Sequence, residues 1–196
     1  MPTILEPTDL SIERAAEALR GGRPVAFPTE TVYGLGALTL DPRGIAEVYR
    51  MKWRPANNPL IAHVLDAHGA RAIVEGWDPR CDELASRLWP GPLTLVLPRR
   101  AGVPSESVGG RASIAVRSPS HPVARRLLQE LGGAALSAPS ANRSGHVSPT
   151  VARHVAEDFA AEPDLLVLDG GRSEFGLEST VLDLTGRVPV LLRPGT

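Results

Sequence analysis

Apolar residues recur along the chain with two spacings, one typical of helices and one typical of strands. Segments with apolar residues three or four positions apart predict helices. These segments are residues 11–20, 41–51, 66–76, 79–89, 121–131 and 148–160. Short apolar runs bounded by turn residues predict strands. These runs are residues 24–28, 59–65, 92–98, 112–118, 134–138, 164–171, 179–186 and 188–195.

Polar residues before three of the helical segments predict where those helices begin. Ser11 precedes the first apolar face, so we expect it to be an N-cap. Asp41 followed by Pro42 is a second N-cap signal, because proline fits the first turn of a helix. Ser148 before Pro149 has the same form. We therefore expect helices to begin next to Ser11, Asp41 and Ser148.

Helical and extended segments alternate from one end of the chain to the other. This order predicts an α/β fold, with a twisted, open, mixed β-sheet flanked by helices. The last two strands are separated by the turn residues "TGRV", which predicts a hairpin. The sequence shows no repeat and no linker-like tract, so we expect residues 1–196 to form a single domain.

Composition narrows the class of protein. The 42% hydrophobic content favours a folded globular domain, and the 4% aromatic content predicts an aliphatic core. A net charge of −1 gives no overall attraction to nucleic acid, so any anion site must be a local cluster of cations. One cysteine, Cys81, excludes an internal disulfide and a cysteine-built zinc site. With no basic N-terminal leader and no long apolar run, we expect a cytoplasmic protein.

The stretch "KWRPANNPL" contains the only lysine of the chain. Pro55 and Pro59 favour an extended segment, in which Lys52 and Arg54 would project to the same side. An ammonium beside a guanidinium suits a polyphosphate, because the first is a point charge and the second a planar fork. The alternative is a solvated basic turn whose cations interact with the end of a helix.

Three other segments place polar side chains beside predicted strands. "FPTETVYGLG" offers Thr29, Glu30 and Thr31 before two glycines, and fits either a ligand-binding loop or a plain turn. His63 alternates with apolar residues, so a structural role is the first expectation for it. Arg117 ends a strand, where α/β proteins place ligand contacts, and could clamp a carboxylate or pair with a structural acid.

A cluster of hydroxyl residues follows in "ALSAPSANRSG" and "HVSPT". Hydroxyls and the amides at a helix N-terminus together form a phosphate cradle, although N-capping also explains Ser148. The phosphate-binding P-loop, the dinucleotide fingerprint and the hydrolase nucleophile motif are all absent. From the residues alone, we expect a loop-built, locally cationic pocket for a phosphorylated ligand.

Taken in order, these segments resemble the YrdC/TsaC family of threonylcarbamoyl-AMP synthases. The matching stretches are "PTETVYGLG", "KWRPANNPL", "WPGPLTLVL", "VRSPSHP", "SAPSANRSG", "SPT", "ESTVLD" and "LLRPG". The resemblance covers nearly the whole chain and looks like the short, single-domain form of the family. It implies a large, concave, positively charged cavity on the predicted sheet.

The resemblance also implies roles for individual residues. Those expected to bind L-threonine are Thr31, His63, Arg117, Ala138 and Ser179. Those expected to bind ATP are Lys52, Arg54, Asn58, Ser113, Ser140, Ser148 and Arg193. Lys52 and Arg54 are also the expected catalytic pair, and no residue is expected to be a dedicated metal ligand.

The implied reaction forms L-threonylcarbamoyladenylate and pyrophosphate from L-threonine, bicarbonate and ATP, which makes the protein a nucleotidyltransferase. We expect Mg²⁺ to accompany ATP, bound mainly by phosphate oxygens and water. The product would be passed to the machinery that modifies adenosine 37 of tRNAs reading codons that begin with A. No membrane partner is implied.

Two other functions compete with this one. The first is an RNA-binding module, or weak RNA binding beside catalysis, but the net charge of −1 and the few aromatics argue against it as the main function. The second is a fragment of a hydrogenase-maturation carbamoyltransferase, whose cysteine-rich zinc segments are not matched by a chain with one cysteine.

Overall fold

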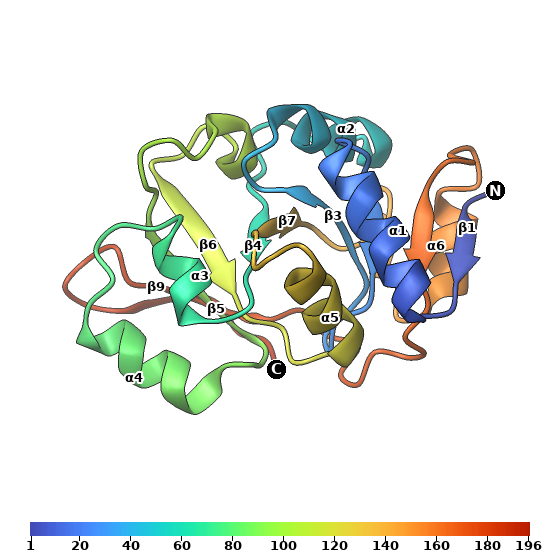
Figure 1. Ribbon diagram of the computed structural model, residues 1–196. Coiled ribbons are helices and arrows are strands. Elements are labelled where there is room, and N and C mark those ends of the chain that lie inside the picture. The colour runs from blue at the N-terminus through green and yellow to red at the C-terminus, as the bar shows by residue number, and fades with distance from the viewer.

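The computed structural model describes all residues, 1–196. The chain forms a single sheet of ten strands with helices packed around it (Figure 1). The strands follow the order β1-β8-β2-β3-β7-β4-β6-β5-β9-β10. Parallel and antiparallel pairs both occur, for example β4 with β6 and β5 with β6. The predicted class, a mixed, twisted α/β sheet flanked by helices, is therefore confirmed.

The strands are β1 Thr3–Leu5, β2 Val25–Phe27, β3 Gly34–Leu38, β4 Ile61–His63, β5 Leu93–Pro98, β6 Ser113–Arg117, β7 Leu136–Ala138, β8 Leu166–Leu168, β9 Thr180–Asp183 and β10 Val190–Arg193. The helices are α1 Asp9–Arg20, α2 Pro42–Lys52, α3 Ala67–Arg71, α4 Pro79–Leu88, α5 Pro122–Glu130 and α6 Ala152–Asp158, with a 3-10 turn at Ser105–Val108. None of the helices is long and apolar enough to cross a membrane.

Helices pack against both faces of the sheet at strand β2. Val25 and Phe27 belong to a core cluster that includes α1 and α5. Ala26, between them, belongs to a second cluster that includes α2 and α6. Successive side chains of a strand point to opposite faces, so this alternation places the two helix pairs on opposite sides of the sheet.

Helices cover only one face of the half-sheet formed by β4, β6, β5 and β9. Ala62 of β4 and both Ile114 and Val116 of β6 pack with α3 and α4 in a third core cluster. The alternate residues on the opposite side, such as Ile61 and Ala115, line a cavity instead. The strand period of two therefore separates a core face from a cavity face within the same strands.

The structure confirms one of the three expected helix starts. Asp41 caps α2, and its Oδ1 accepts a hydrogen bond from the Arg43 amide at 3.0 Å. The Ser11 prediction is wrong, because Thr8 caps α1 and accepts from the Ser11 amide. The Ser148 prediction is also wrong.

The last helix, α6, begins at Ala152 rather than next to Ser148. Val151 before it has extended backbone angles and provides no side-chain cap. The Ser148 hydroxyl donates to the Glu178 carboxylate at 3.0 Å rather than accepting from a helix amide. A tertiary contact therefore takes the place of the local capping interaction.

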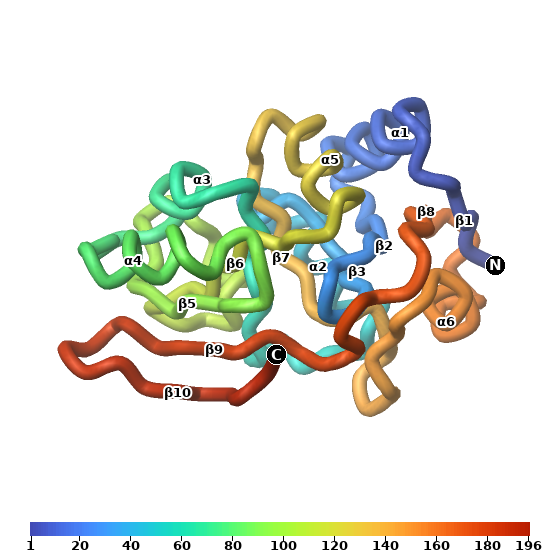
Figure 2. Tube along the Cα trace, turned by 90° about the horizontal axis from the view of Figure 1, so that it is seen from below, coloured from blue at the N-terminus to red at the C-terminus, as the bar shows by residue number.

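The predicted C-terminal hairpin is confirmed, since β9 and β10 are antiparallel neighbours. Figure 2 shows them side by side at one margin of the molecule, with β1 and β8 at the other. Strands β1 and β3 were not predicted. The glycines of β3 have no side chains, so the strand shows no alternation of apolar and polar residues in the sequence. A Cβ at Gly36 would lie 2.7 Å from the Phe27 ring, so glycine is needed at this position.

We expect Leu127→Ala to lower the free energy of unfolding by about 2–5 kcal/mol, because the change leaves a cavity beneath α5. Leu127 is fully buried in the cluster shared with α1. Leu10→Ala is the matched control, since this helical leucine is 75% exposed. Urea unfolding would measure both, and equal losses in the two variants would contradict the described packing.

Candidate active site

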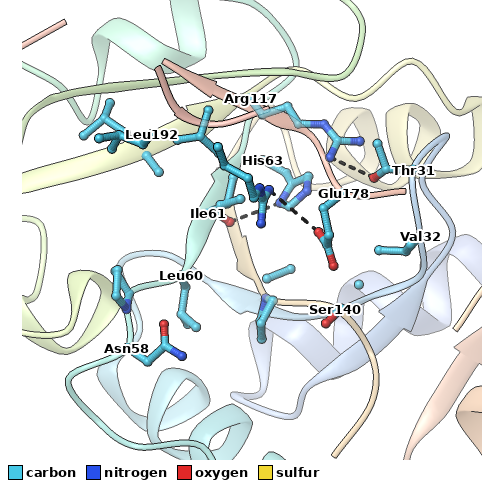
Figure 3. Close-up of a pocket in the computed structure, with 18 of the residues that line it drawn as sticks. Thr31, Val32, Asn58, Leu60, Ile61, His63, Arg117, Ser140, Glu178 and Leu192 are labelled. Atoms are coloured by element: carbon cyan, nitrogen blue, oxygen red, sulfur yellow. Dashed lines mark hydrogen bonds and ion pairs between the residues drawn. The ribbon is translucent and has the colours of Figure 1, made fainter. Parts of the chain in front are cut away.

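A cavity of about 590 Å³ lies against the uncovered face of β4, β6, β5 and β9 (Figure 3). Its floor is made by alternate strand residues: Ile61, His63, Val96, Ser113, Ala115, Arg117, Val181 and Asp183. Loops after β2, α2 and β7 form its walls, with Thr31, Arg54, Asn58 and Ser140 among their residues. Four arginines and two carboxylates line it, namely Arg54, Arg111, Arg117 and Arg193 with Glu178 and Asp183.

Strand register brings His63 and Arg117 together. Strands β4 and β6 are parallel, and His63 pairs directly with Arg117 at the carboxyl end of each strand. Carboxyl ends of parallel strands are the usual ligand-binding edge of α/β sheets. Two residues separated by 54 positions in the sequence thus become neighbours on the cavity floor.

Arg117 is buried, and its guanidinium is only partly satisfied. Nη1 donates to the Thr31 hydroxyl at 2.9 Å. Nη2 forms a buried ion pair with Oε1 of Glu30 at 2.9 Å. Nε is buried without a hydrogen-bond partner. Arg117 also lines the cavity, where its positive charge can attract an entering carboxylate.

Glu30 belongs to the same site but acts from behind Arg117, since it does not line the cavity. Its Oε2 accepts from the Ser120 amide at 3.1 Å, which ties the loop after β2 to the loop after β6. Burial lowers the pKa of Arg117, and the Glu30 charge opposes that effect. Glu30 thus stabilises the charged guanidinium in a buried position.

His63 is held as a neutral ring. Its Nδ1 lies 3.1 Å from the Ile61 carbonyl oxygen, and its ring packs edge-on against Phe27. Burial, and secondarily the Arg117 charge, lower the pKa of His63 to about 3. The expected structural role and a contact with a ligand are compatible, because the satisfied ring also lines the cavity.

The Lys52 ammonium is buried behind the cavity wall. It donates to the Ser140 carbonyl at 2.5 Å and to the Asn142 carbonyl, and Lys52 is not among the lining residues. Burial, and then repulsion from Arg54, lower the pKa of Lys52 to about 7. Two carbonyl acceptors match the two N–H groups of a neutral amine.

The expectation that Lys52 and Arg54 lie on one side of an extended segment is wrong. Lys52 is the last residue of α2, and Trp53 after it has a left-handed backbone with φ of 52°. This turn sends Arg54 toward the cavity wall, where its guanidinium donates to the Asn58 and Pro59 carbonyls. Arg54 is still close enough to Lys52 to lower the affinity of the lysine for protons.

The C-terminal residues close the cavity on the β9 side. Arg193 donates through Nε to the Ser179 carbonyl and through Nη2 to its hydroxyl, each at 3.0 Å. The buried Ser179 hydroxyl also contacts that of Thr94 at 2.8 Å. Thr196 bonds back to Glu178 and Thr180. The last strand is thereby held over the start of β9.

The structure brings the twelve predicted residues into one region, in two layers. Nine of them line the cavity: Thr31, Arg54, Asn58, His63, Ser113, Arg117, Ala138, Ser140 and Arg193. Lys52, Ser148 and Ser179 lie just behind it, each bonded to a lining residue. Their contacts with substrates stay predictions.

Sequence reasoning missed four charged residues of the site. Glu30 and Glu178 lie inside quoted motifs, next to Thr31 and Ser179, yet neither was assigned a role. Asp183, the last residue of the quoted stretch "ESTVLD", and Arg111, which lies outside every quoted stretch, also line the cavity. The clue available for the two glutamates was a charged residue beside a buried strand, which is rarely left without a partner.

Because the Lys52 ammonium is buried, we expect it to titrate at a lower pH than an exposed lysine. Because it is the only lysine, protein labelled with ¹³C-lysine gives one side-chain signal in NMR. We expect its midpoint near the pKa of about 7. In the pH range between this value and the ordinary lysine pKa of 10.5, the unfolded state binds more protons than the folded state. The free energy of unfolding should therefore rise with pH, by up to about 1.4 kcal/mol per pH unit. A midpoint above pH 10 would contradict the described burial.

Comparison with known proteins agrees with this fold and motif order. Residues 17–195 match the model of the Sua5/YciO/YrdC family, which is described as telomere recombination. The threonylcarbamoyl-AMP synthase of Pyrococcus abyssi is 49% identical over 184 residues, which are 94% of this chain and 54% of that protein. The threonylcarbamoyl-AMP synthase of Bacillus subtilis is 44% identical over 192 residues, 97% of this chain and 55% of that protein.

A solved structure gives the same result. The crystal structure of P. abyssi Sua5 complexed with L-threonine has a TM-score of 0.94 and 45% identity, and covers 98% of this chain and 57% of that one. The chain spans about half the length of the curated relatives that it matches. The family match nevertheless extends over almost all of its residues, and the resemblance inferred from the motifs is confirmed: the chain belongs to the Sua5/YciO/YrdC family.

Proposed function

We propose that this protein is a threonylcarbamoyl-AMP synthase. It would make L-threonylcarbamoyladenylate and pyrophosphate from L-threonine, bicarbonate and ATP, as a nucleotidyltransferase. The observation that carries the proposal is the buried, positively charged guanidinium of Arg117 at the floor of the cavity. An amino-acid carboxylate would pair with this charge. Relatives with this name, and a relative crystallised with L-threonine, support the same substrate.

The threonine end of the cavity lies over β4, β6 and β7. Arg117 would bind the threonine carboxylate from the cavity floor. Thr31 and His63 present a hydroxyl and a neutral imidazole beside it, and the backbone near Ala138 forms the adjacent wall. Ser179 would act through its hydrogen bonds to Thr94 and Arg193.

The ATP end lies toward the loops after α2 and β7. Arg54 and Arg193 are the lining cations among the predicted ATP residues, and Asn58, Ser113 and Ser140 add polar groups. Ser148 and Lys52 stand behind this wall. A triphosphate would favour the charged form of Lys52, because nearby negative charge raises the pKa of an amine.

The proposed chemistry needs no protein nucleophile. The threonine amine attacks bicarbonate or CO₂ derived from it, and a carbamate oxygen then attacks the α-phosphorus of ATP with loss of pyrophosphate. Both nucleophiles belong to the substrates, so the protein contributes positioning and charge neutralisation. A cavity with more arginines than carboxylates fits that task, and we propose that it is cationic.

Mg²⁺ would arrive with ATP. The chain has no group of three histidine, cysteine or acidic side chains that could hold a metal ion. A magnesium ion bound by triphosphate oxygens and water needs no such group. When bound, it would neutralise phosphate charge during the departure of pyrophosphate.

The product is a labile mixed anhydride, so we propose that it is consumed soon after release. The consumer would be the cytoplasmic machinery that transfers the threonylcarbamoyl group to adenosine 37 of tRNAs reading codons that begin with A. The chain spans only about half of its relatives, so the activity of the chain itself is the first point to test.

The test is pyrophosphate release from ATP, measured with and without threonine and with and without bicarbonate. Arg54→Ala and Lys52→Ala should each cost roughly 2–4 kcal/mol of transition-state stabilisation, by loss of an electrostatic donor. Arg153→Ala is the control, because this arginine is 77% exposed on α6 and away from the cavity.

Near-wild-type rates in both Arg54→Ala and Lys52→Ala would contradict the assigned phosphate-binding residues. Release that ignores threonine or bicarbonate would contradict the proposed reaction. RNA affinity with a steep salt dependence, and no threonine-dependent turnover, would favour an RNA-binding module instead.

A further inference from the structure

Two carboxylates line a cavity that is proposed to gather anions, Glu178 and Asp183. A carboxylate near a triphosphate raises the energy of the complex, since like charges a few ångströms apart repel by about 1–4 kcal/mol. Each therefore needs either a structural partner or a cation among the substrates. The two residues differ in this respect.

Asp183 has a structural partner. It ends β9, and its Oδ1 accepts a hydrogen bond from the Thr185 amide at 2.8 Å. That contact shapes the turn into β10 at the start of the C-terminal hairpin. Its position on the cavity margin follows from this turn, and no ligand is needed to explain it.

Glu178 has partners of a different kind, a serine hydroxyl and a more distant arginine, and no backbone amide. Its Oε1 accepts from the Ser148 hydroxyl at 3.0 Å, while its Oε2 is 3.8 Å from Nη2 of Arg193, beyond hydrogen-bond distance. The side chain is 38% exposed and reaches into the cavity near Thr31 and Ser140 (Figure 3). One of its oxygens thus remains available to a ligand.

Glu178 also lies where the two halves of the site meet. Burial lowers the pKa of Lys52, Arg54 and Arg117, and the negative charge of Glu178 opposes that shift in all three, on the ATP side and on the threonine side. Ser148 and Arg193, which it contacts, belong to the predicted ATP residues, while Ser179 beside it belongs to the predicted threonine residues. This junction is where the threonine amine would have to meet bicarbonate and the α-phosphate.

Only two positive groups come with the proposed substrates, the threonine ammonium and Mg²⁺. Magnesium needs close to six oxygen ligands in octahedral geometry, which the triphosphate oxygens and water can supply without Glu178. An ammonium needs only one or two acceptors within hydrogen-bond distance. The free oxygen of Glu178 meets the second requirement.

We propose that the Glu178 carboxylate binds the threonine ammonium and accepts its proton as the carbamate forms. This inference rests on the proposed function and assigns a catalytic residue to it. One ammonium proton passes to the carboxylate, and the freed nitrogen lone pair forms a bond to the carbon of bicarbonate. The C–OH bond breaks, and the hydroxyl leaves as water with a second proton from nitrogen. The proton on Glu178 then leaves to solvent.

Glu178→Gln tests this assignment, because glutamine keeps an oxygen for the Ser148 hydroxyl but cannot accept the proton. We expect threonine- and bicarbonate-dependent pyrophosphate release at saturating substrate to fall at least about 100-fold. The KM for ATP should stay equal or decrease, because a negative charge has left the phosphate environment. The affinity for threonine, measured by calorimetry, should fall by about tenfold or more.

Glu13→Gln is the matched control, since it also removes one negative charge, from an exposed position on α1 outside the cavity. Its rate of pyrophosphate release should remain within about threefold of wild type, because a substitution that removes no contact has little effect. An equal loss in both variants would show a general charge effect and overturn the assignment to Glu178.

Other outcomes separate this inference from the proposed function. A Glu178→Gln protein that reacts as fast as wild type, or faster, overturns the inference alone. A variant whose rate returns to the wild-type value at high Mg²⁺ makes Glu178 a metal ligand and also overturns it. If the wild-type protein binds threonine but makes no product, the proposed function fails, and the threonine affinity of Glu178→Gln still decides the inference. If the wild-type protein binds no threonine, both fail.

Discussion

The site depends on one constraint, the alternation of side chains along β4, β6, β5 and β9. The same strands send Ala62, Ile114 and Val116 into the core with α3 and α4, and send Ile61, Ala115 and Arg117 to the cavity. Because the period is two, a shift of register by one residue would exchange the two sets. Core packing on one face therefore fixes the position of the polar groups on the other.

A buried charge network then gives this surface its chemical character. Arg117 is held by an ion pair with Glu30 and a hydrogen bond to Thr31, and it lines the cavity floor. Pairing with Glu30 offsets part of the desolvation cost of the guanidinium, and an entering carboxylate can offset more. Pre-organised charge of this kind is effective because it needs little rearrangement when the ligand binds. The same logic extends to Arg54 and Arg193, which are held by backbone carbonyls.

The parts of this arrangement that sequence could predict are those set by local rules. Asp41 before Pro42 caps α2 as expected, and Arg117 ends a strand as its alternation indicated. Long-range contacts decided the rest. The Ser148 hydroxyl bonds to Glu178 instead of capping a helix, and the non-glycine left-handed residue Trp53 redirects the chain after Lys52. Most cavity residues lie in the quoted motifs, because these motifs end or follow strands. The partners of Glu30 and Glu178 could be identified only once the order of the strands in the sheet was known.

The most direct test of the account is a crystal structure of the protein with L-threonine and a non-hydrolysable ATP analogue. The account predicts the threonine carboxylate within hydrogen-bond distance of the Arg117 guanidinium, on the uncovered face of β4 and β6, with the triphosphate toward Arg54. Threonine bound elsewhere, with Arg117 still contacting only Thr31 and Glu30, would contradict the claim that the uncovered sheet face is the substrate site.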